Sequence, residues 1–114
     1  MADERTAARL RAERRRIAAQ VDTLQSDFDA IVSASEFTAT DDEHDPDGAT
    51  IGFERAQAGA LLNRARLRLE ALDRALARLN AGTYGSCERC GGTIAPERLA
   101  ALPDTTVCVQ CAAS

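Results

Sequence analysis

Hydrophobic residues in the first third of the chain recur at alternating steps of three and four. They are Leu10, Ile17, Val21, Leu24, Phe28 and Ile31. Arg14 is the one polar residue at a position of this series. A three-four spacing is the heptad pattern of a helix that packs against a second helix. With Asp3 as a plausible N-cap, the pattern predicts a helix from there to about Ser33.

A second series with the same spacing lies in the middle of the chain. Its members are Ala58, Leu62, Ala65, Leu69, Leu72, Leu76 and Leu79. Pro46 suits the first position of a helix, with Asp45 as its N-cap. Gly82 suits the position just after a helix end. The second helix is therefore predicted to run from Pro46 to about Asn80.

The two series match in an antiparallel register. Ile17 would face Leu72 and Phe37 would face Phe53, and both pairs share one fold-back point near His44-Asp45. The alternative, in which the series pair between two chains, does not require a common fold-back point. We therefore expect an antiparallel coiled-coil hairpin within one monomeric chain.

Two CxxC pairs follow this hairpin. The first is Cys87 with Cys90 and the second is Cys108 with Cys111, and 17 residues separate the pairs. This spacing is typical of a structural zinc site with four thiolate ligands, in which no coordination position is left for a substrate. Gly91-Gly92 supplies the backbone freedom that the first turn needs. The alternative, two disulfides, requires an oxidising compartment.

The segment around the cysteines completes the predicted fold. Tyr84 is expected to pack where the finger meets the coil. The stretch 96–102 can form a short helix that ends before Pro103. The fold class is thus all-α dominated: a long antiparallel two-helix coiled-coil hairpin over residues 1–82, and a small C-terminal four-Cys zinc finger over residues 83–114.

Composition and charge agree with this architecture. Aromatic residues make up 4% of the chain and Trp is absent, which suits long helices better than a thick core. No apolar stretch resembles a signal peptide or a membrane span, so a cytoplasmic location with reduced thiols is expected. The net charge of −4 argues against a general nucleic-acid binder. Within the finger, Arg89 and Arg98 are the only basic residues, which disfavours direct DNA binding.

The acidic residues are concentrated in the middle of the chain. From Asp22 to Glu54 there are ten acidic residues and no arginine. The predicted fold-back places several of them, including Asp42, Asp45 and Asp47, at a tip near residues 38–49. Such a loop is often merely solvated. At the end of a coil, however, its carboxylates can reach into a narrow cleft, where Mg²⁺ or basic loops would attract them.

Other polar groups carry less specific signals. His44 can titrate near neutral pH, but a plain surface position is the simpler interpretation. The run of Arg14, Arg15 and Arg16 fits a solvated helix face better than a contact with an acidic partner. The cysteines are assigned to the metal and the single histidine lies far from them in sequence, so no nucleophile–base pair is available and an enzyme is not expected.

The finger resembles the DksA/TraR family. The resemblance rests on Tyr84-Gly85-Ser86-Cys87-Glu88-Arg89-Cys90-Gly91, Ile94, Arg98-Leu99-Ala100-Ala101-Leu102-Pro103 and Cys108-Val109-Gln110-Cys111. It implies a regulator that binds RNA polymerase directly, inserts its coiled coil into the secondary channel and modulates transcription initiation. The alternative is a zinc-stabilised coiled-coil adaptor that binds another protein and does not act at polymerase.

The resemblance also assigns individual residues. The second Asp and the Ala of the DksA tip motif fall on Asp47 and Ala49, and the first Asp falls on His44, with Asp45 beside it. A basic position that grips polymerase falls on Arg64. Basic residues that help DksA form a ppGpp site fall on residues that are not basic here, so a ppGpp site of that type is not predicted. Those residues are Ala71, Leu102 and Ala112.

Overall fold

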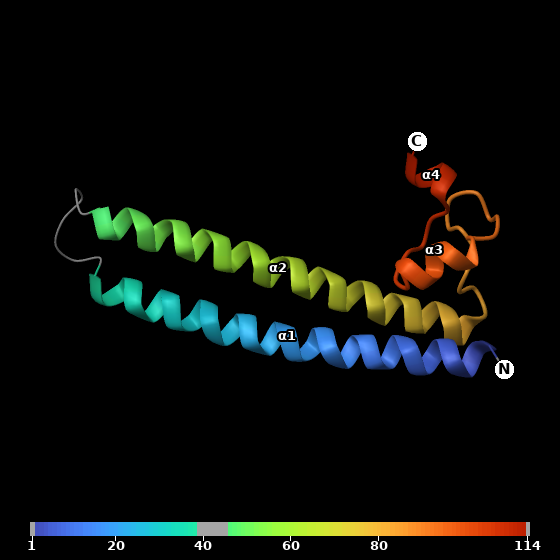
Figure 1. The fold of residues 1–114 in the computed structure, drawn as a ribbon, viewed down its shortest axis with the longest axis horizontal. Helices are drawn as coiled ribbons and strands as arrows, with labels where there is room; N and C mark the ends of the chain where they lie inside the picture. Colours follow the sequence, from blue (N-terminus) through green and yellow to red (C-terminus); the bar gives the residue numbers. More distant parts are fainter. Residues whose placement is uncertain (1, 39–45, 114) are drawn as a thin grey trace. The chain divides into compact units, whose positions relative to one another are not determined.

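The fold is known from a computed structural model that describes residues 2–38 and 46–113. Within that part of the chain it contains four helices, which are labelled in Figure 1: α1 (Ala2–Thr38), α2 (Pro46–Ala81), α3 (Pro96–Ala101) and α4 (Val109–Ala113). None of the described helices is both long enough and apolar enough to cross a membrane.

Helix α2 begins and ends where the sequence predicts. Pro46 is its first residue, a position where a missing N–H costs nothing. At its other end Gly82 has a φ of 79°, which an L side chain rarely adopts. The N–H of Gly82 donates to the carbonyl of Leu79 at 3.2 Å. The N–H of Thr83 donates to the carbonyl of Arg78 at 2.8 Å. These two bonds form a Schellman motif, which satisfies the last carbonyls of the helix.

Helix α1 is longer than predicted. It continues past Ser33 to Thr38, although serine and threonine weaken a helix. The Ser35 hydroxyl bonds to the carbonyl of Val32 within the same helix at 2.8 Å, so its polar group needs no partner outside the helix. Residues 33–38 contain no proline or glycine. Because polar residues alone do not break a helix, α1 continues through them.

The chain divides into two compact units. The finger unit combines Met1–Arg16 with Arg68–Ser114, and the coil unit is Ile17–Leu67. In each unit a stretch of α1 runs antiparallel to a stretch of α2 (Figure 1). The predicted boundary between coil and finger at residue 82 stays a prediction.

The buried core of the finger unit is small. Leu10, Leu72, Ala75 and Ile94 have at most 1% of their surface exposed. Ala75 is a correction to the predicted series, which placed Leu76 at the interface and left Ala75 out. Leu76 is half-buried instead. A small side chain at the interface allows two helices to approach closely, a feature that a search for large hydrophobic residues overlooks.

Two contacts between α1 and α2 fall within one helical turn of the predicted register. In the finger unit Arg14 forms an ion pair with Asp73. In the coil unit a Cβ on Gly59 would lie 3.6 Å from the ring of Phe28. Arg14, the polar residue in the apolar series, therefore keeps its charge paired and half-exposed at the edge of the interface.

A small ionic network links three segments of the finger unit. The guanidinium of Arg68 on α2 lies 3.2 Å from the Glu13 carboxylate on α1 and 4.0 Å from that of Asp104, after α3. The Arg68 Nε is buried and has no hydrogen-bond partner among the described residues. Arg68 thus ties both long helices to the segment that leads into the second cysteine pair.

Candidate metal centre

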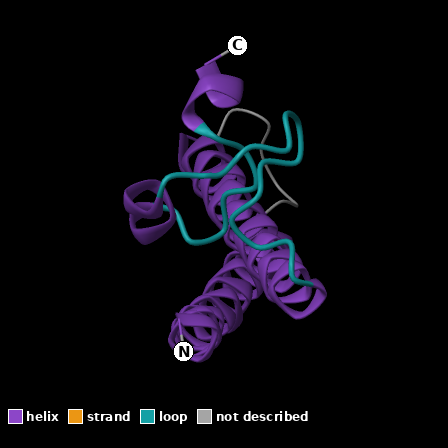
Figure 2. Ribbon diagram, turned by 90° about the vertical axis from the view of Figure 1, so that its right-hand side faces the viewer, coloured by secondary structure: helices purple, strands orange, loops and turns teal. Residues whose placement is uncertain are grey.

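The first cysteine pair lies on a narrow turn. Ser86 and Thr93 form an isolated antiparallel bridge, and the N–H of Cys87 bonds to the carbonyl of Gly92 at 2.7 Å. The N–H of Ile94 bonds back to Gly85 at 2.8 Å. This part of the finger consists of loops and turns (Figure 2). The bridge closes the turn, so both sulfurs are held on one side of it.

The two glycines of this turn have different tasks. Gly91 has a φ of 74°, and its N–H bonds to the carbonyl of Cys87 at 2.9 Å. Gly92 does not need a positive φ, but its N–H donates to the Sγ of Cys90 at 3.4 Å. A Cβ at Gly92 would lie 3.3 Å from that sulfur, tighter than most real contacts. One glycine therefore allows the turn, and the other lets the backbone approach the sulfur.

The second cysteine pair lies at the start of α4. This short helix was not predicted, since the sequence indicated only a second turn. The N–H of Ala112 bonds to the carbonyl of Cys108 at 2.9 Å, which places Cys111 one turn after Cys108. The segment before Cys108 is anchored too, because the Arg98 guanidinium donates to Val107 at 3.0 Å and Glu88 N–H bonds to Thr106 at 2.9 Å.

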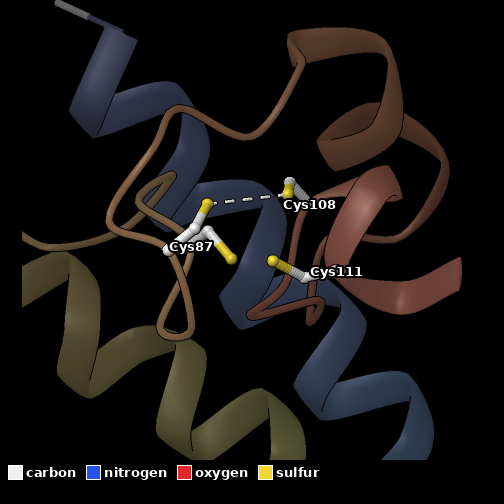
Figure 3. Close-up of side chains that lie close together, drawn as sticks. Cys87, Cys108 and Cys111 are labelled. Atoms are coloured by element: carbon white, nitrogen blue, oxygen red, sulfur yellow. Dashed lines mark hydrogen bonds between the residues drawn. The ribbon is translucent and has the colours of Figure 1, made fainter. Parts of the chain in front are cut away.

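The four sulfurs converge on one point. The Sγ atoms of Cys87, Cys90, Cys108 and Cys111 all lie within 4.8 Å of one another. In Figure 3 the sulfurs of the three labelled cysteines point toward a common centre. All four thiols are free, so the geometry is not that of two disulfides.

The spacing fits a tetrahedral metal ion. Cys90 Sγ and Cys108 Sγ are 3.8 Å apart. A tetrahedron with Zn–S bonds of about 2.3 Å has sulfur–sulfur edges of about 3.8 Å. The cysteines are thus positioned to bind one metal ion, and a C4 thiolate set favours Zn²⁺. With four protein ligands the ion has no open position, which makes its role structural.

Hydrogen bonds adjust the acidity of the thiols. Backbone hydrogen bonds from Cys108 and then Cys90 lower the pKa of the Cys87 thiol to about 6. A backbone hydrogen bond from Cys111 lowers the pKa of Cys108. The pKa of Cys111 is raised to about 12, chiefly by its side-chain hydrogen bond with Cys108. Four adjacent thiols thus resist full ionisation unless a cation compensates their charge, and a divalent metal supplies that compensation.

The sulfurs differ in their access to solvent. Cys87 is 3% exposed, whereas Cys108 and Cys111 are half-buried and Cys90 is exposed. The buried sulfur belongs to the turn that packs next to Ile94, which is 1% exposed. A metal ion bound here would thus be held by one buried cysteine and by three cysteines that are more open to solvent.

The predicted tip lies largely outside the described structure. Asp42, His44 and Asp45 fall in residues 39–45, outside the described residues. Asp47 and Ala49 belong to the first turn of α2, and only their backbone is described. Their assignment to a tip site therefore stays a prediction.

Arg64 is exposed on α2, in the coil unit. A long basic side chain at an exposed helical position is free to meet a partner, which agrees with the predicted polymerase contact without testing it. The network of Arg68 with Glu13 and Asp104 was missed. Its members are far apart in sequence, and no local pattern marks them as partners.

Comparison with known proteins agrees with the geometry of the finger. Residues 82–114 match the family described as prokaryotic dksA/traR C4-type zinc finger. The fold is similar to the structure of transcription factor DksA2 from Pseudomonas aeruginosa, with a TM-score of 0.77 and 25% identity. That similarity covers 97% of this chain and 80% of DksA2. The structure of a DnaK suppressor protein from Agrobacterium tumefaciens C58 is also similar, with a TM-score of 0.59 and 29% identity over 96% of this chain and 90% of its own.

Two curated sequences match part of the chain. An uncharacterized protein of Aquifex aeolicus is 50% identical over 44 residues, which are 39% of this chain and 30% of that protein. General stress protein 16O of Bacillus subtilis is 36% identical over 69 residues, which are 60% of this chain and 42% of that protein. The chain therefore spans less than half the length of the curated relatives it matches.

Proposed function

We propose that this chain, which belongs to the DksA/TraR family through the zinc finger of residues 82–114, is a DksA-like transcription regulator. In this proposal it binds RNA polymerase, inserts the tip of its coiled coil into the secondary channel and modulates initiation. The proposal rests mainly on how much of the chain is structurally similar to DksA2. The similarity to DksA2 covers 97% of the chain, so it includes the two long helices as well as the finger.

The proposal gives each part a separate task. Residues 1–82 form the coiled coil, and residues 83–114 form a finger whose zinc ion holds its two cysteine pairs together. The residues between α1 and α2 form the tip together with the first turn of α2, and Asp45 and Asp47, with Asp42 and Ala49, act near the polymerase active site. Carboxylates suit that place because hard divalent cations and basic loops attract them.

Arg64, on the exposed side of α2, is proposed to contact the polymerase. It is exposed, whereas Arg66, two residues later, is engaged by the side chain of Gln25 on α1. A free guanidinium can form bidentate bonds to a carboxylate of the partner. Truncation of Arg64 would therefore weaken the complex and leave the coil intact.

The finger is not proposed to bind DNA. Its two arginines are engaged within the finger: Arg98 donates to the carbonyl of Val107, and Arg89 donates to that of Cys111 at 3.1 Å. DNA binding rests on basic side chains that reach phosphates. We further propose that the regulator is cytoplasmic and non-enzymatic and that it acts on polymerase as a monomer. A DksA-type ppGpp site is not part of this proposal.

Direct binding tests this proposal. The tagged protein is incubated with the core RNA polymerase of its own organism, and the complex is isolated by size-exclusion chromatography. We expect co-elution, weakened by Arg64→Ala and unchanged by Arg55→Ala, which alters another exposed arginine of α2. If neither the wild type nor the Arg55→Ala protein binds polymerase, the proposal is wrong and the adaptor hypothesis replaces it.

A further inference from the structure

A groove runs along one side of the coil unit. It has a volume of about 230 Å³ and lies between α1 and α2. Leu24 and Ile31 of α1 and Ala58 and Leu61 of α2 form its apolar lining. From Leu24 to Ile31 the α1 wall is about 10 Å long, which corresponds to two turns of helix.

The apolar lining is only partly covered. Leu61 is 43% exposed, and Leu24, Ile31 and Ala58 are half-buried. Phe53, two helical turns before Leu61, is 70% exposed. Two helices can bury the seam between them but leave the sides of that seam open. A third helix in the groove would cover these side chains, as in a helix bundle.

Both walls of the groove carry an acidic residue. Asp27 lies on the α1 wall and Glu54 on the α2 wall, and both are exposed. The sequence of the coil unit is acidic as well, since residues 17–67 contain ten acidic residues and three arginines. The carboxylates on both walls therefore favour cationic groups at the groove.

We propose that this groove binds a basic amphipathic helix of a protein partner. The apolar residues of that helix, at i, i+3 or i+4 and i+7, would lie on Leu24, Ile31 and Leu61. Its Arg or Lys residues would flank this stripe and meet Asp27 on one side and Glu54 on the other. The site is separate from the zinc finger and does not depend on binding to RNA polymerase.

Two such grooves on separate copies of the chain pair poorly face to face. The same face of another coil unit carries the same carboxylates, so pairing of two such faces would bring like charges together. Charge complementarity therefore selects a cationic partner.

A designed peptide tests the groove directly. The probe is an 18-residue fluorescein-labelled peptide with Leu at helical a/d-type spacing and Arg on both flanks, and its binding to the full-length zinc-loaded protein is followed by anisotropy. A scrambled peptide of the same composition has the same charge but no apolar stripe. We expect the amphipathic peptide to bind more tightly, with amide NMR shifts concentrated in residues 24–31 and 54–61.

Matched variants separate the groove from general charge attraction. Leu61→Ser and Asp27→Asn/Glu54→Gln should each weaken binding about tenfold, which corresponds to about 1.4 kcal/mol. Leu67→Ser and Asp22→Asn/Glu36→Gln should change it less than about twofold, because these exposed residues lie well over 90° around their helix axes from the groove. Circular dichroism verifies that each variant is folded.

Three results would overturn the proposal: no binding of the amphipathic peptide, equal binding of the scrambled peptide, or equal losses in the groove and control variants. Concentration-dependent self-association that Leu61→Ser abolishes would also contradict it, because a second copy would then occupy the groove. Since polymerase is absent from the assay, these results leave the proposed function untouched.

Discussion

The hydroxyl of Tyr84 donates a hydrogen bond to the carbonyl oxygen of Pro103 at 2.9 Å. Tyr84 lies at the start of the finger and Pro103 lies after α3. This bond therefore closes a loop that contains the first cysteine pair. The same tyrosine lines a pocket together with Leu10 of α1 and Leu99 of α3. The side chain therefore joins the start of the finger to the segment after α3.

Tyr84 should titrate above the range of a free tyrosine. Burial raises its pKa, because the charged phenolate is poorly solvated there. A raised folded-state pKa means that the neutral phenol stabilises the fold below the ordinary pKa of 10.0, and that this contribution is lost as the pH rises through the folded value. Absorbance at 295 nm measures the titration cleanly, because the chain has one Tyr and no Trp. A midpoint at or below that of the urea-unfolded protein would contradict this assignment.

Loss of the Tyr84 hydroxyl should lower the free energy of unfolding by a small but measurable amount. In Tyr84→Phe the ring remains and the bond to Pro103 is lost, which should lower the free energy of unfolding by about 1 kcal/mol. Urea unfolding of the zinc-loaded protein measures the change. Thr93→Val, which alters another exposed residue of the finger, serves as a comparison for general effects of substitution in the finger.

Removal of the metal should unfold the finger and leave long helices in place. The sulfurs that converge within 4.8 Å become close, unshielded thiols once the cation is gone. Chelation should release about one zinc per chain, with loss of amide dispersion for residues 83–114 in NMR spectra and most of the helical circular dichroism retained. Cys108→Ser should abolish stoichiometric zinc binding. Stoichiometric zinc in that variant, or a finger that stays folded without metal, would contradict the structural role.

Two glycines should respond to alanine in opposite directions. Gly91 has a φ of 74°, so Gly91→Ala should destabilise the finger by about 1–2 kcal/mol. Gly52 lies inside α2, where a Cβ would meet nothing within 4 Å, so Gly52→Ala should stabilise the protein by about 0.5–1 kcal/mol. Zinc competition assays follow the first variant and thermal unfolding the second. The same sign for both would contradict the assigned conformations.

The carboxylate of Glu13 should stabilise the fold above its ordinary pKa and lose this contribution in acid. A hydrogen bond from Arg16 lowers its pKa, and the charge of Arg68 adds to this effect. A lowered folded-state pKa stabilises the fold above the unfolded value of 4.5, and this contribution is lost as the pH falls through the folded value. Glu13→Gln should therefore destabilise the protein at pH 7 and much less at pH 3, by urea unfolding. Glu70→Gln, at an exposed position of α2, serves as the comparison variant.

The sequence predicted those features that local chemistry determines. The spacing of the cysteines predicted a common metal site, Pro46 predicted the start of α2, and Gly82 predicted its end. Each of these features depends on neighbouring residues alone: a CxxC turn, a missing N–H or a positive φ. The heptad pattern similarly predicted which faces of α1 and α2 meet.

Features that depend on packing at a distance were not predicted. Ala75 is 1% exposed, yet alanine carries no strong signal of burial by itself. The partners of Arg68 come from α1 and from the segment after α3, so only the folded chain brings them together. Helix α4 is too short to show periodicity, and its hydrogen bonds form around Cys108 in the folded finger.

The central claim is that the acidic tip acts inside RNA polymerase. The most direct measurement compares the wild type with Asp45→Asn/Asp47→Asn for polymerase binding and for promoter transcription in the same preparation. Asp22→Asn/Glu36→Gln, which removes two charges from the described part of α1, is the matched control. Our account predicts that all three proteins bind equally, and that only the tip variant loses its effect on initiation. An unchanged transcriptional effect of the tip variant, or no effect of the bound wild type, would contradict it.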